Sequence, residues 1–228
     1  MLRSRSGIGG LQAAGIAVII VGMAPVVTSL FASGVGLGDA LRRTAVEGSA
    51  HVDDVLDPAF RRALWSEIQR GPLREMKGTF GAARVTMDTE GFDVEAPFDG
   101  FPLVRGLAAE LATRVREDGA GIRGLASWAP NEAGVGVYRP GTVGVTAHMD
   151  GKWYRRLVVV MTVVGSARFE VRASRDGEIL DAWVARAGGV TLMRGPGLAG
   201  RRDGRPYHAV HGPTRGVRCS LAFRMAFD

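Results

Sequence analysis

The pattern of apolar and polar residues predicts helices in the first half of the globular sequence. Asp57 followed by Pro58 is typical of a helix start, because aspartate caps the free amides and proline fits the first helical position. The apolar residues that follow recur at helical spacing until Gly71 and Pro72 end the segment. A second helix is predicted over residues 103–117, where apolar residues stand four apart at Leu107, Leu111 and Val115.

Later in the chain the pattern becomes one of short apolar or alternating runs separated by turn residues, which predicts strands. A first short strand is expected at residues 51–56. The later ones are expected at residues 135–137, 143–148, 157–164, 167–172, 190–193 and 217–227. The run 157–164 is apolar almost throughout and therefore indicates a central strand covered on both faces. Two helices followed by many strands fit a mostly β fold (α+β), a sheet sandwich with flanking helices, as one domain over residues 50–228.

Residues 1–49 are expected to form an apolar extension before this domain. No charged residue stands between Gly7 and Gly38, and residues 11–32 roughly supply the length of a membrane span. Arg3 and Arg5 precede this stretch, as in a signal peptide or membrane anchor, whereas Pro25 and several glycines interrupt it. Three interpretations stay open: an anchor, a signal, or a spurious extension created by a misplaced start codon.

Composition adds limits on the function. The chain has 228 residues, which suits one domain, and its 33 glycines favour a fold rich in turns and strands. The net charge of +6 would suit nucleic acid or an anionic membrane as a partner, but nearly all the basic residues are arginine, which can reflect base composition alone. The single Cys219 excludes an internal disulfide and is most simply a small core residue.

Candidate metal ligands come from the histidines. His148 and Asp150 stand two residues apart at the end of a predicted strand, so both side chains point to the same face and can reach one ion. A third ligand from a distant strand would complete two histidines and one carboxylate, a set that leaves positions open on non-haem iron(II). His208 and His211 compete for that place, whereas His51 is expected to be a surface or capping residue.

The last predicted strand carries a row of polar residues. By period two, Arg218, Ser220, Ala222 and Arg224 share one face, and the alternate residues take the core face. If the arginine face looks into the fold, it needs an anionic partner, because a buried unpaired guanidinium is costly. A dicarboxylate fits, since the arginine fork binds carboxylates with two hydrogen bonds.

Taken in order, these motifs resemble the Fe(II)- and 2-oxoglutarate-dependent dioxygenase superfamily, most closely its AlkB-type branch. The matching stretches are Tyr138-Arg-Pro-Gly141, His148-Met-Asp150, His208, and Arg218-x-Ser-x-x-Phe-Arg224. The resemblance covers about residues 135 to 226. It implies a double-stranded β-helix, or jelly roll, that binds Fe(II) and uses 2-oxoglutarate and oxygen as co-substrates.

Carried over residue by residue, the resemblance implies iron ligation by His148, Asp150 and His208. His208 is preferred to His211 because its ten-residue interval to the arginine strand matches the family. The resemblance further implies three cofactor-binding residues. Arg218 would form a salt bridge to the distal carboxylate of 2-oxoglutarate, Arg224 would be a second anchor, and Tyr138 would donate a hydrogen bond to the co-substrate. No catalytic residue is implied beyond the metal ligands.

The substrate is less defined than the chemistry. AlkB-type proteins usually carry an asparagine two residues before the tyrosine, where this chain has Gly136. We therefore expect hydroxylation of a small molecule or a protein side chain, with AlkB-like oxidative demethylation of nucleic acid as the alternative. A non-catalytic jelly-roll protein that binds a ligand without turning it over is a third hypothesis. Residues 153–156 are expected either to line the substrate mouth or to form a solvated turn. The supply of reduced iron and 2-oxoglutarate favours a cytoplasmic location.

Overall fold

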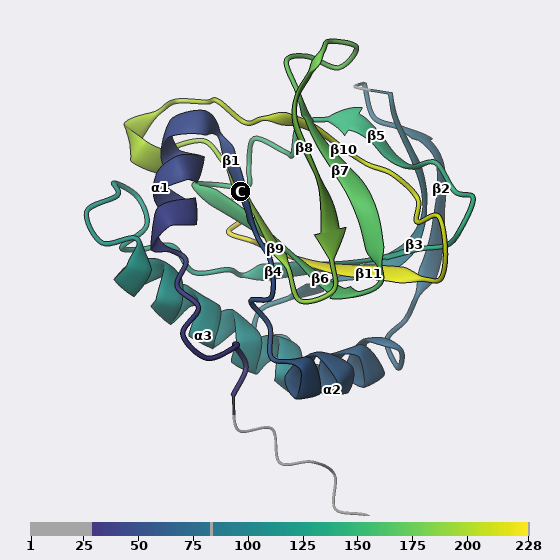
Figure 1. The fold of residues 1–228 in the computed structure, drawn as a ribbon, viewed down its shortest axis with the longest axis horizontal. Helices are drawn as coiled ribbons and strands as arrows, with labels where there is room; N and C mark the ends of the chain where they lie inside the picture. Colours follow the sequence, from purple (N-terminus) through teal and green to yellow (C-terminus); the bar gives the residue numbers. More distant parts are fainter. Residues whose placement is uncertain (1–28, 83, 228) are drawn as a thin grey trace, which may run out of the picture.

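The computed structural model describes residues 29–82 and 84–227, which form one layered fold (Figure 1). Its helices are α1 (Gly38–Glu47), α2 (Pro58–Ile68) and α3 (Pro102–Asp118), with a short 3-10 helix η1 at Leu198–Gly200. The strands are β1 (Ser49–Val52), β2 (Arg74–Phe80), β3 (Val85–Glu95), β4 (Glu132–Tyr138), β5 (Gly144–His148), β6 (Leu157–Val164), β7 (Ser166–Arg172), β8 (Ile179–Arg186), β9 (Val190–Arg194), β10 (Tyr207–Val210) and β11 (Arg218–Arg224).

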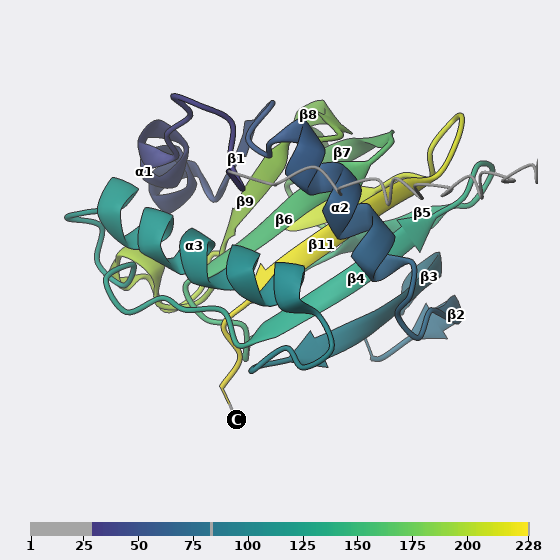
Figure 2. The ribbon, with the colours of Figure 1, turned by 90° about the horizontal axis from the view of Figure 1, so that it is seen from below.

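These strands form one antiparallel sheet that folds back on itself. The order is β1-β9-β6-β11-β4-β3-β5-β10-β7-β8, with β2 paired to β3. Strands β9, β6, β11 and β4 make a broad layer with α2 and α3 against its outer face, and β5, β10, β7 and β8 lie over its other side (Figures 1 and 2). The molecule is therefore a jelly roll with flanking helices, which confirms the fold class expected from the sequence.

Both predicted helices form where expected, and each is capped. The Asp57 side chain accepts hydrogen bonds from the amides of Ala59 and Phe60 at 2.8 and 2.9 Å, so it caps α2. The first amides of α3 instead donate to the buried carboxylate of Glu67, 3.0 Å from the amide of Leu103. A side chain near the end of α2 thus stabilises the start of α3, which favours their packing side by side.

Two hydrophobic clusters fill the layers. The larger lies between the helices and the broad sheet, and the smaller lies between the two facing sheets. Strand β6 contributes to both, because Leu157 and Val159 face the helices while Val158 faces the second sheet. This confirms the prediction that residues 157–164 form a central strand with both faces covered.

The structure also contains elements that the pattern did not predict: α1, the β2–β3 hairpin, β8, β10 and the short helix η1. Helix α1 lies within the segment 1–49 that was expected to precede the domain. Phe31, Leu37 and Leu41 from that segment are buried in the larger core cluster. Packed core residues therefore precede position 50, where the domain was expected to start. The strand expected at residues 51–56 is β1, which lies earlier, at Ser49–Val52.

The anchor or signal predicted over residues 11–32 lies mostly outside the described residues. Its last part is described, and there Phe31 forms a β-bridge with Leu56 inside the fold. Among the residues that the structure describes, no helix is both long and apolar enough to cross a membrane.

Candidate metal and co-substrate site

Three candidate ligands meet at the end of two paired strands. His148 is the last residue of β5, and His208 lies directly opposite it on β10. Asp150 follows two residues after the end of β5. One side-chain nitrogen or oxygen from each residue lies within 4.8 Å of the others. The structure therefore brings together the two histidines and the carboxylate that the sequence singled out.

Backbone contacts orient both imidazole rings. The Nδ1 atom of His148 lies 2.8 Å from the carbonyl oxygen of Thr146, and that of His208 lies 3.3 Å from the carbonyl of Pro206. A carbonyl can only accept, so each Nδ1 carries a proton, which in a neutral ring leaves the lone pair on Nε2. Histidines that bind metals are held in this way.

The electrostatics of the site favour the protonation states that a metal requires. Burial, reinforced by the neighbouring His148, lowers the pKa of His208 to about 4, so its ring is neutral at pH 7. Burial alone would raise the pKa of Asp150. In the acidic range where Asp150 titrates, the attraction of protonated His208, of Arg224 and of His148 outweighs that effect and holds the pKa of the Asp150 carboxyl below its usual value. Neutral imidazole and ionised carboxylate are the forms that ligate metals.

The two other histidines lie elsewhere. The Nε2 atom of His211 lies 3.0 Å from the carboxylate of Glu170, and its side chain is about half exposed. His51 was expected to be a surface or capping residue, but its side chain is only 10% exposed and stacks on Trp183. The contacts of His51 are thus structural, and of the two candidates for the third ligand the structure places His208 in the cluster.

A cavity of about 130 Å³ lies between the two sheets and contains the three candidate ligands. Arg218 lies in its wall with only 1% of its surface exposed. Its Nη2 donates to the hydroxyl of Thr162 at 3.4 Å, while Nε and Nη1 have no partner among the described residues. An unpaired buried guanidinium costs several kcal/mol by order of magnitude unless an anion meets it. The cavity therefore fits a ligand that carries a carboxylate.

Tyr138 occupies the space next to Arg218. Its side chain is buried, and the guanidinium carbon of Arg218 lies 4.9 Å from the centre of its ring. A Cβ atom added to Gly136 would lie 3.2 Å from Tyr138 and 3.3 Å from the hydroxyl of Ser220. The asparagine usual in AlkB-type proteins would be crowded at this position.

Arg224 differs from Arg218, because the protein supplies its partners. Its Nη1 lies 2.7 Å from the carboxylate of Glu132 and 3.4 Å from that of Asp93. The guanidinium also lies over the ring of Tyr154, whose hydroxyl donates to Glu132 at 2.8 Å. Its Nε is buried without a hydrogen-bond partner among the described residues.

The alternation predicted for β11 is confirmed. Arg218, Ser220, Ala222 and Arg224 line the cavity. The alternate residues lie in the larger core cluster: Cys219, Leu221 and Phe223. Burial raises the pKa of the Cys219 thiol to about 12, as suits a core residue.

Residues 153–156 lie outside the cavity wall as the structure describes it. The Trp153 side chain is 56% exposed, and Arg156 donates to the carbonyl of Gly124 at 2.8 Å. Other wall residues were not predicted from the sequence, above all Met76, Met87 and Thr89 of the β2–β3 hairpin. The hydroxyl of Thr89 is buried without a hydrogen-bond partner among the described residues. The alternation of polar and apolar residues around Met87 and Thr89 was the only signal.

Comparisons with known proteins identify the fold. No protein-family model matches the chain, and no curated protein matches it in sequence. A prolyl-4-hydroxylase from Pseudomonas putida is similar in structure, with a TM-score of 0.54 and 17% identity over 84% of this chain and 99% of that one. A prolyl hydroxylase from Trichoplax adhaerens, solved with a peptide fragment, has a TM-score of 0.56 and 11% identity over 82% and 87%.

A third solved structure is a non-haem α-ketoglutarate-dependent carbocyclase from nogalamycin biosynthesis. It has a TM-score of 0.58 and 15% identity over 85% of each chain. These comparisons do not single out the AlkB-type branch. The chain has the jelly-roll fold of Fe(II)- and 2-oxoglutarate-dependent oxygenases.

Proposed function

We propose that this protein is an Fe(II)- and 2-oxoglutarate-dependent oxygenase that hydroxylates a small molecule or a protein side chain. One observation carries the proposal: a cluster of two imidazoles and a carboxylate shares its cavity with a buried arginine that lacks an anionic partner among the described residues. Either feature alone has a structural explanation. Together they match an iron site with open positions and a binding site for a dicarboxylate.

In this proposal His148, Asp150 and His208 hold Fe(II), and Arg218 pairs with the distal carboxylate of 2-oxoglutarate. The bound iron and co-substrate supply the oxidation: one oxygen molecule converts 2-oxoglutarate to succinate and carbon dioxide and hydroxylates a C–H bond. The chain's own residues bind and orient. Tyr138 flanks Arg218, and apolar walls that include Val158, Phe169 and Met193 limit the entry of water.

Arg224 receives a different role from that expected. Its contacts with Glu132 satisfy its charge within the protein. The pKa of Arg224 is raised above its usual value: burial opposes ionisation, but the carboxylate of Asp150 outweighs it. We therefore assign Arg224 to the electrostatic support of Asp150 rather than to direct contact with the co-substrate.

The substrate class rests on two observations. Gly136 lacks the side chain that AlkB-type proteins carry at this position, and Tyr138 and Ser220 crowd the space around it. The structurally similar proteins include a prolyl hydroxylase solved with a peptide and a carbocyclase from a biosynthetic pathway. Both observations favour a protein side chain or a small molecule over nucleic acid.

The decisive experiment is anaerobic titration of the full chain with Fe(II) and then 2-oxoglutarate, followed by exposure to oxygen. We expect a metal-to-ligand charge-transfer band on addition of 2-oxoglutarate, and succinate after oxygen is admitted. His148→Ala and Asp150→Ala should lose both signals, whereas His211→Ala, which removes a half-exposed histidine outside the cluster, should keep both. Full activity in the first two variants would overturn the assignment. A band without succinate would indicate a binding barrel.

The nucleic-acid alternative rests on the net charge of +6. It predicts binding to single-stranded oligonucleotides that weakens steeply with salt, and release of formaldehyde from N-methylated bases. We expect neither. Salt-dependent binding together with formaldehyde release would replace the proposed substrate class but would leave the metal site unchanged.

A further inference from the structure

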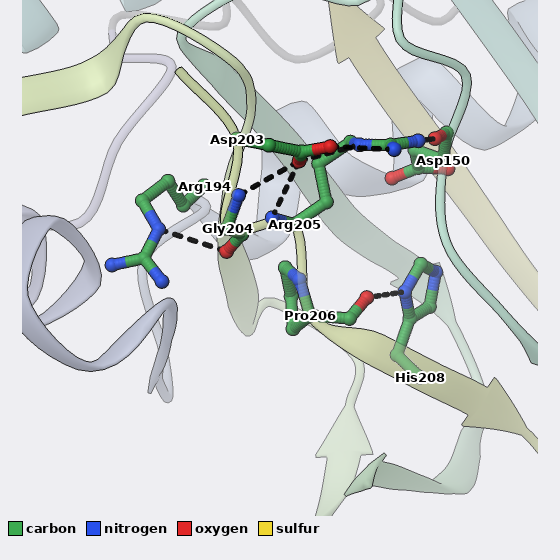
Figure 3. Close-up of polar contacts among 7 residues, drawn as sticks. All are labelled: Asp150, Arg194, Asp203, Gly204, Arg205, Pro206 and His208. Atoms are coloured by element: carbon green, nitrogen blue, oxygen red, sulfur yellow. Dashed lines mark hydrogen bonds and ion pairs between the residues drawn. The ribbon is translucent and has the colours of Figure 1, made fainter. Parts of the chain in front are cut away.

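The turn at residues 203–206, just before β10, is built around one carboxylate. The side chain of Asp203 accepts hydrogen bonds from the amides of Gly204 and Arg205 at 2.7 and 3.2 Å. It also accepts two from the Arg205 guanidinium, from Nε and Nη2, both at 2.9 Å. This fork holds the pKa of Asp203 well below its usual range. The turn and the direction of the Arg205 side chain are therefore fixed together (Figure 3).

The remaining donor of Arg205 reaches across to the metal cluster. Its Nη1 donates to the backbone carbonyl of Asp150, a candidate ligand 55 residues earlier in the chain (Figure 3). An exposed arginine–aspartate pair contributes little to stability. Here, however, the Arg205 side chain is only 7% exposed, although that of Asp203 is 45% exposed. The guanidinium is thus enclosed between Asp203 and the segment that carries Asp150.

The same turn orients a second candidate ligand. The carbonyl of Pro206, the residue after Arg205, accepts the hydrogen bond from Nδ1 of His208 at 3.3 Å (Figure 3). A shift of the turn would therefore change the ring orientation of His208 and release the carbonyl of Asp150 at once. Two of the three candidate ligands depend on the position of this turn.

Arg194 links the 203–206 turn to helix α1 through hydrogen bonds. The carbonyl of Gly204 accepts a hydrogen bond at 2.8 Å from Nε of Arg194, a buried residue at the end of β9. The Nη1 atom of Arg194 donates to the carbonyls of Ala45 and Val46 in α1, at 3.1 and 3.2 Å. Gly204 has a φ of +129°, and a Cβ atom there would lie 2.8 Å from Arg194. Helix α1 and β9 thus support the turn, and glycine allows the close approach.

We propose that Arg205 is a positioning residue for the metal site, and that with Asp203 it fastens the 203–206 turn to the segment carrying Asp150. This inference rests on the proposed function, because it takes His148, Asp150 and His208 as metal ligands. Loss of the hydrogen bond from Arg205 to the carbonyl of Asp150 should make the distance between the Asp150 and His208 side chains more variable and so weaken metal binding.

The direction of the change in metal affinity shows whether Arg205 acts by positioning the ligands or only through its charge. Arg205 is a cation close to a cation site, so removing its charge should by itself strengthen metal binding. Positioning predicts the reverse. Loss of residues that orient metal ligands typically costs about 10- to 100-fold in metal affinity. We expect a loss in this range for Arg205→Ala, and a smaller loss for Arg205→Lys, which keeps the charge but lacks the fork.

The test measures Mn(II) binding to the full chain by the electron paramagnetic resonance signal of free Mn(II), with no turnover required. Arg202→Ala is the matched control, because it removes an exposed arginine one residue before the turn. It should leave the affinity nearly unchanged. Thermal unfolding of the metal-free variants shows whether the fold persists. If Arg205→Ala does not fold, Asp203→Asn, which weakens the fork but keeps Arg205, takes its place.

Each outcome decides a separate question. If the unaltered chain binds no Mn(II), the proposed function fails before the role of Arg205 is tested. If the chain binds Mn(II) and the folded Arg205→Ala protein binds equally well or more tightly, the positioning role is wrong. If it binds less tightly while Arg202→Ala does not, Arg205 positions the ligands.

Discussion

Arg218 on β11 lies directly opposite Tyr138 on β4, and its guanidinium carbon stands 4.9 Å from the centre of the tyrosine ring. The aromatic face offers partial compensation for a buried cation. It does not satisfy Nε and Nη1, which have no hydrogen-bond partner among the described residues. Arg218 is thus a preorganised cation in the cavity wall with two donors that no described residue accepts, and an anionic ligand would fit them.

This relationship predicts opposite effects of one substitution on stability and binding. Arg218→Met should raise the melting temperature of the ligand-free protein, because it removes a buried charge without full pairing. It should weaken 2-oxoglutarate binding about 10- to 100-fold, equivalent to the loss of about 1.5–3 kcal/mol from charge-assisted hydrogen bonds. Calorimetric titration and thermal melts of the Mn(II)-loaded protein test both. A destabilised variant that binds normally would show that Arg218 is purely structural.

Arg224 should respond differently, because Glu132 already pairs with it. Glu132→Gln should destabilise the fold by about 2–3 kcal/mol, near the low end for buried pairs because 20% of the Arg224 side chain is exposed. The affinity for 2-oxoglutarate should change little. Urea unfolding and the same titration measure the two effects. Asp93→Asn is the control: its 65% exposed carboxylate, 3.4 Å away, should contribute under about 1 kcal/mol. A large loss of 2-oxoglutarate affinity in Glu132→Gln would restore Arg224 as an anchor.

Local pattern accounts for the parts of the fold that the sequence predicted. Helices α2 and α3 and strand β6 have clear periodicity and terminal signals, so neighbouring residues alone define them. The β2–β3 hairpin does not, because most of β2 is exposed and polar. Helix α1 was missed because a long uncharged stretch precedes it, which suggested an extension rather than a packed element.

The same distinction applies to the site. His148 and Asp150 were found because strand geometry relates residues two apart, and Arg218 because β11 alternates. Arg205 carries no such local signal, and the alternation around Thr89 does not by itself place that residue in the cavity wall. The partner of Arg205 is 55 residues away, and the position of Thr89 in the cavity wall depends on how β3 bends toward β5. Contacts of this kind arise only from the assembled sheet.

A pH dependence should arise at Glu170, on the outer face of β7. Burial would raise the pKa of its carboxyl, but hydrogen bonds from Arg168 and Arg172 at 2.8 and 3.0 Å and the nearby His211 hold the pKa below its usual value. A depressed pKa stabilises the fold above the unfolded pKa, and this contribution is lost as the pH falls through the folded pKa. Glu170→Gln should therefore be less stable than the unaltered chain at pH 7, with the gap closing as the pH falls below the usual pKa of a glutamate.

Urea unfolding at several pH values measures this gap. Glu178→Gln, at an exposed position just before β8, is the matched control and should show almost no difference at any pH. A gap for Glu170→Gln that stays constant down to the lowest pH would mean that the ionised form of Glu170 does not stabilise the fold.

The contribution of α1 can be tested within the helix itself. Leu41 has no exposed surface and packs in the larger core cluster, whereas Val46, five residues later, is 70% exposed. If residues before position 50 belong to the folded domain, Leu41→Ala should cost about 2–5 kcal/mol of stability, as for other buried leucines. Val46→Ala should cost under about 0.5 kcal/mol. Equal and small effects of both in chemical denaturation would place the start of the stable domain after α1. A large effect confined to Leu41 would mean that a chain beginning at residue 50 lacks part of its core, together with the α1 carbonyls that hold Arg194.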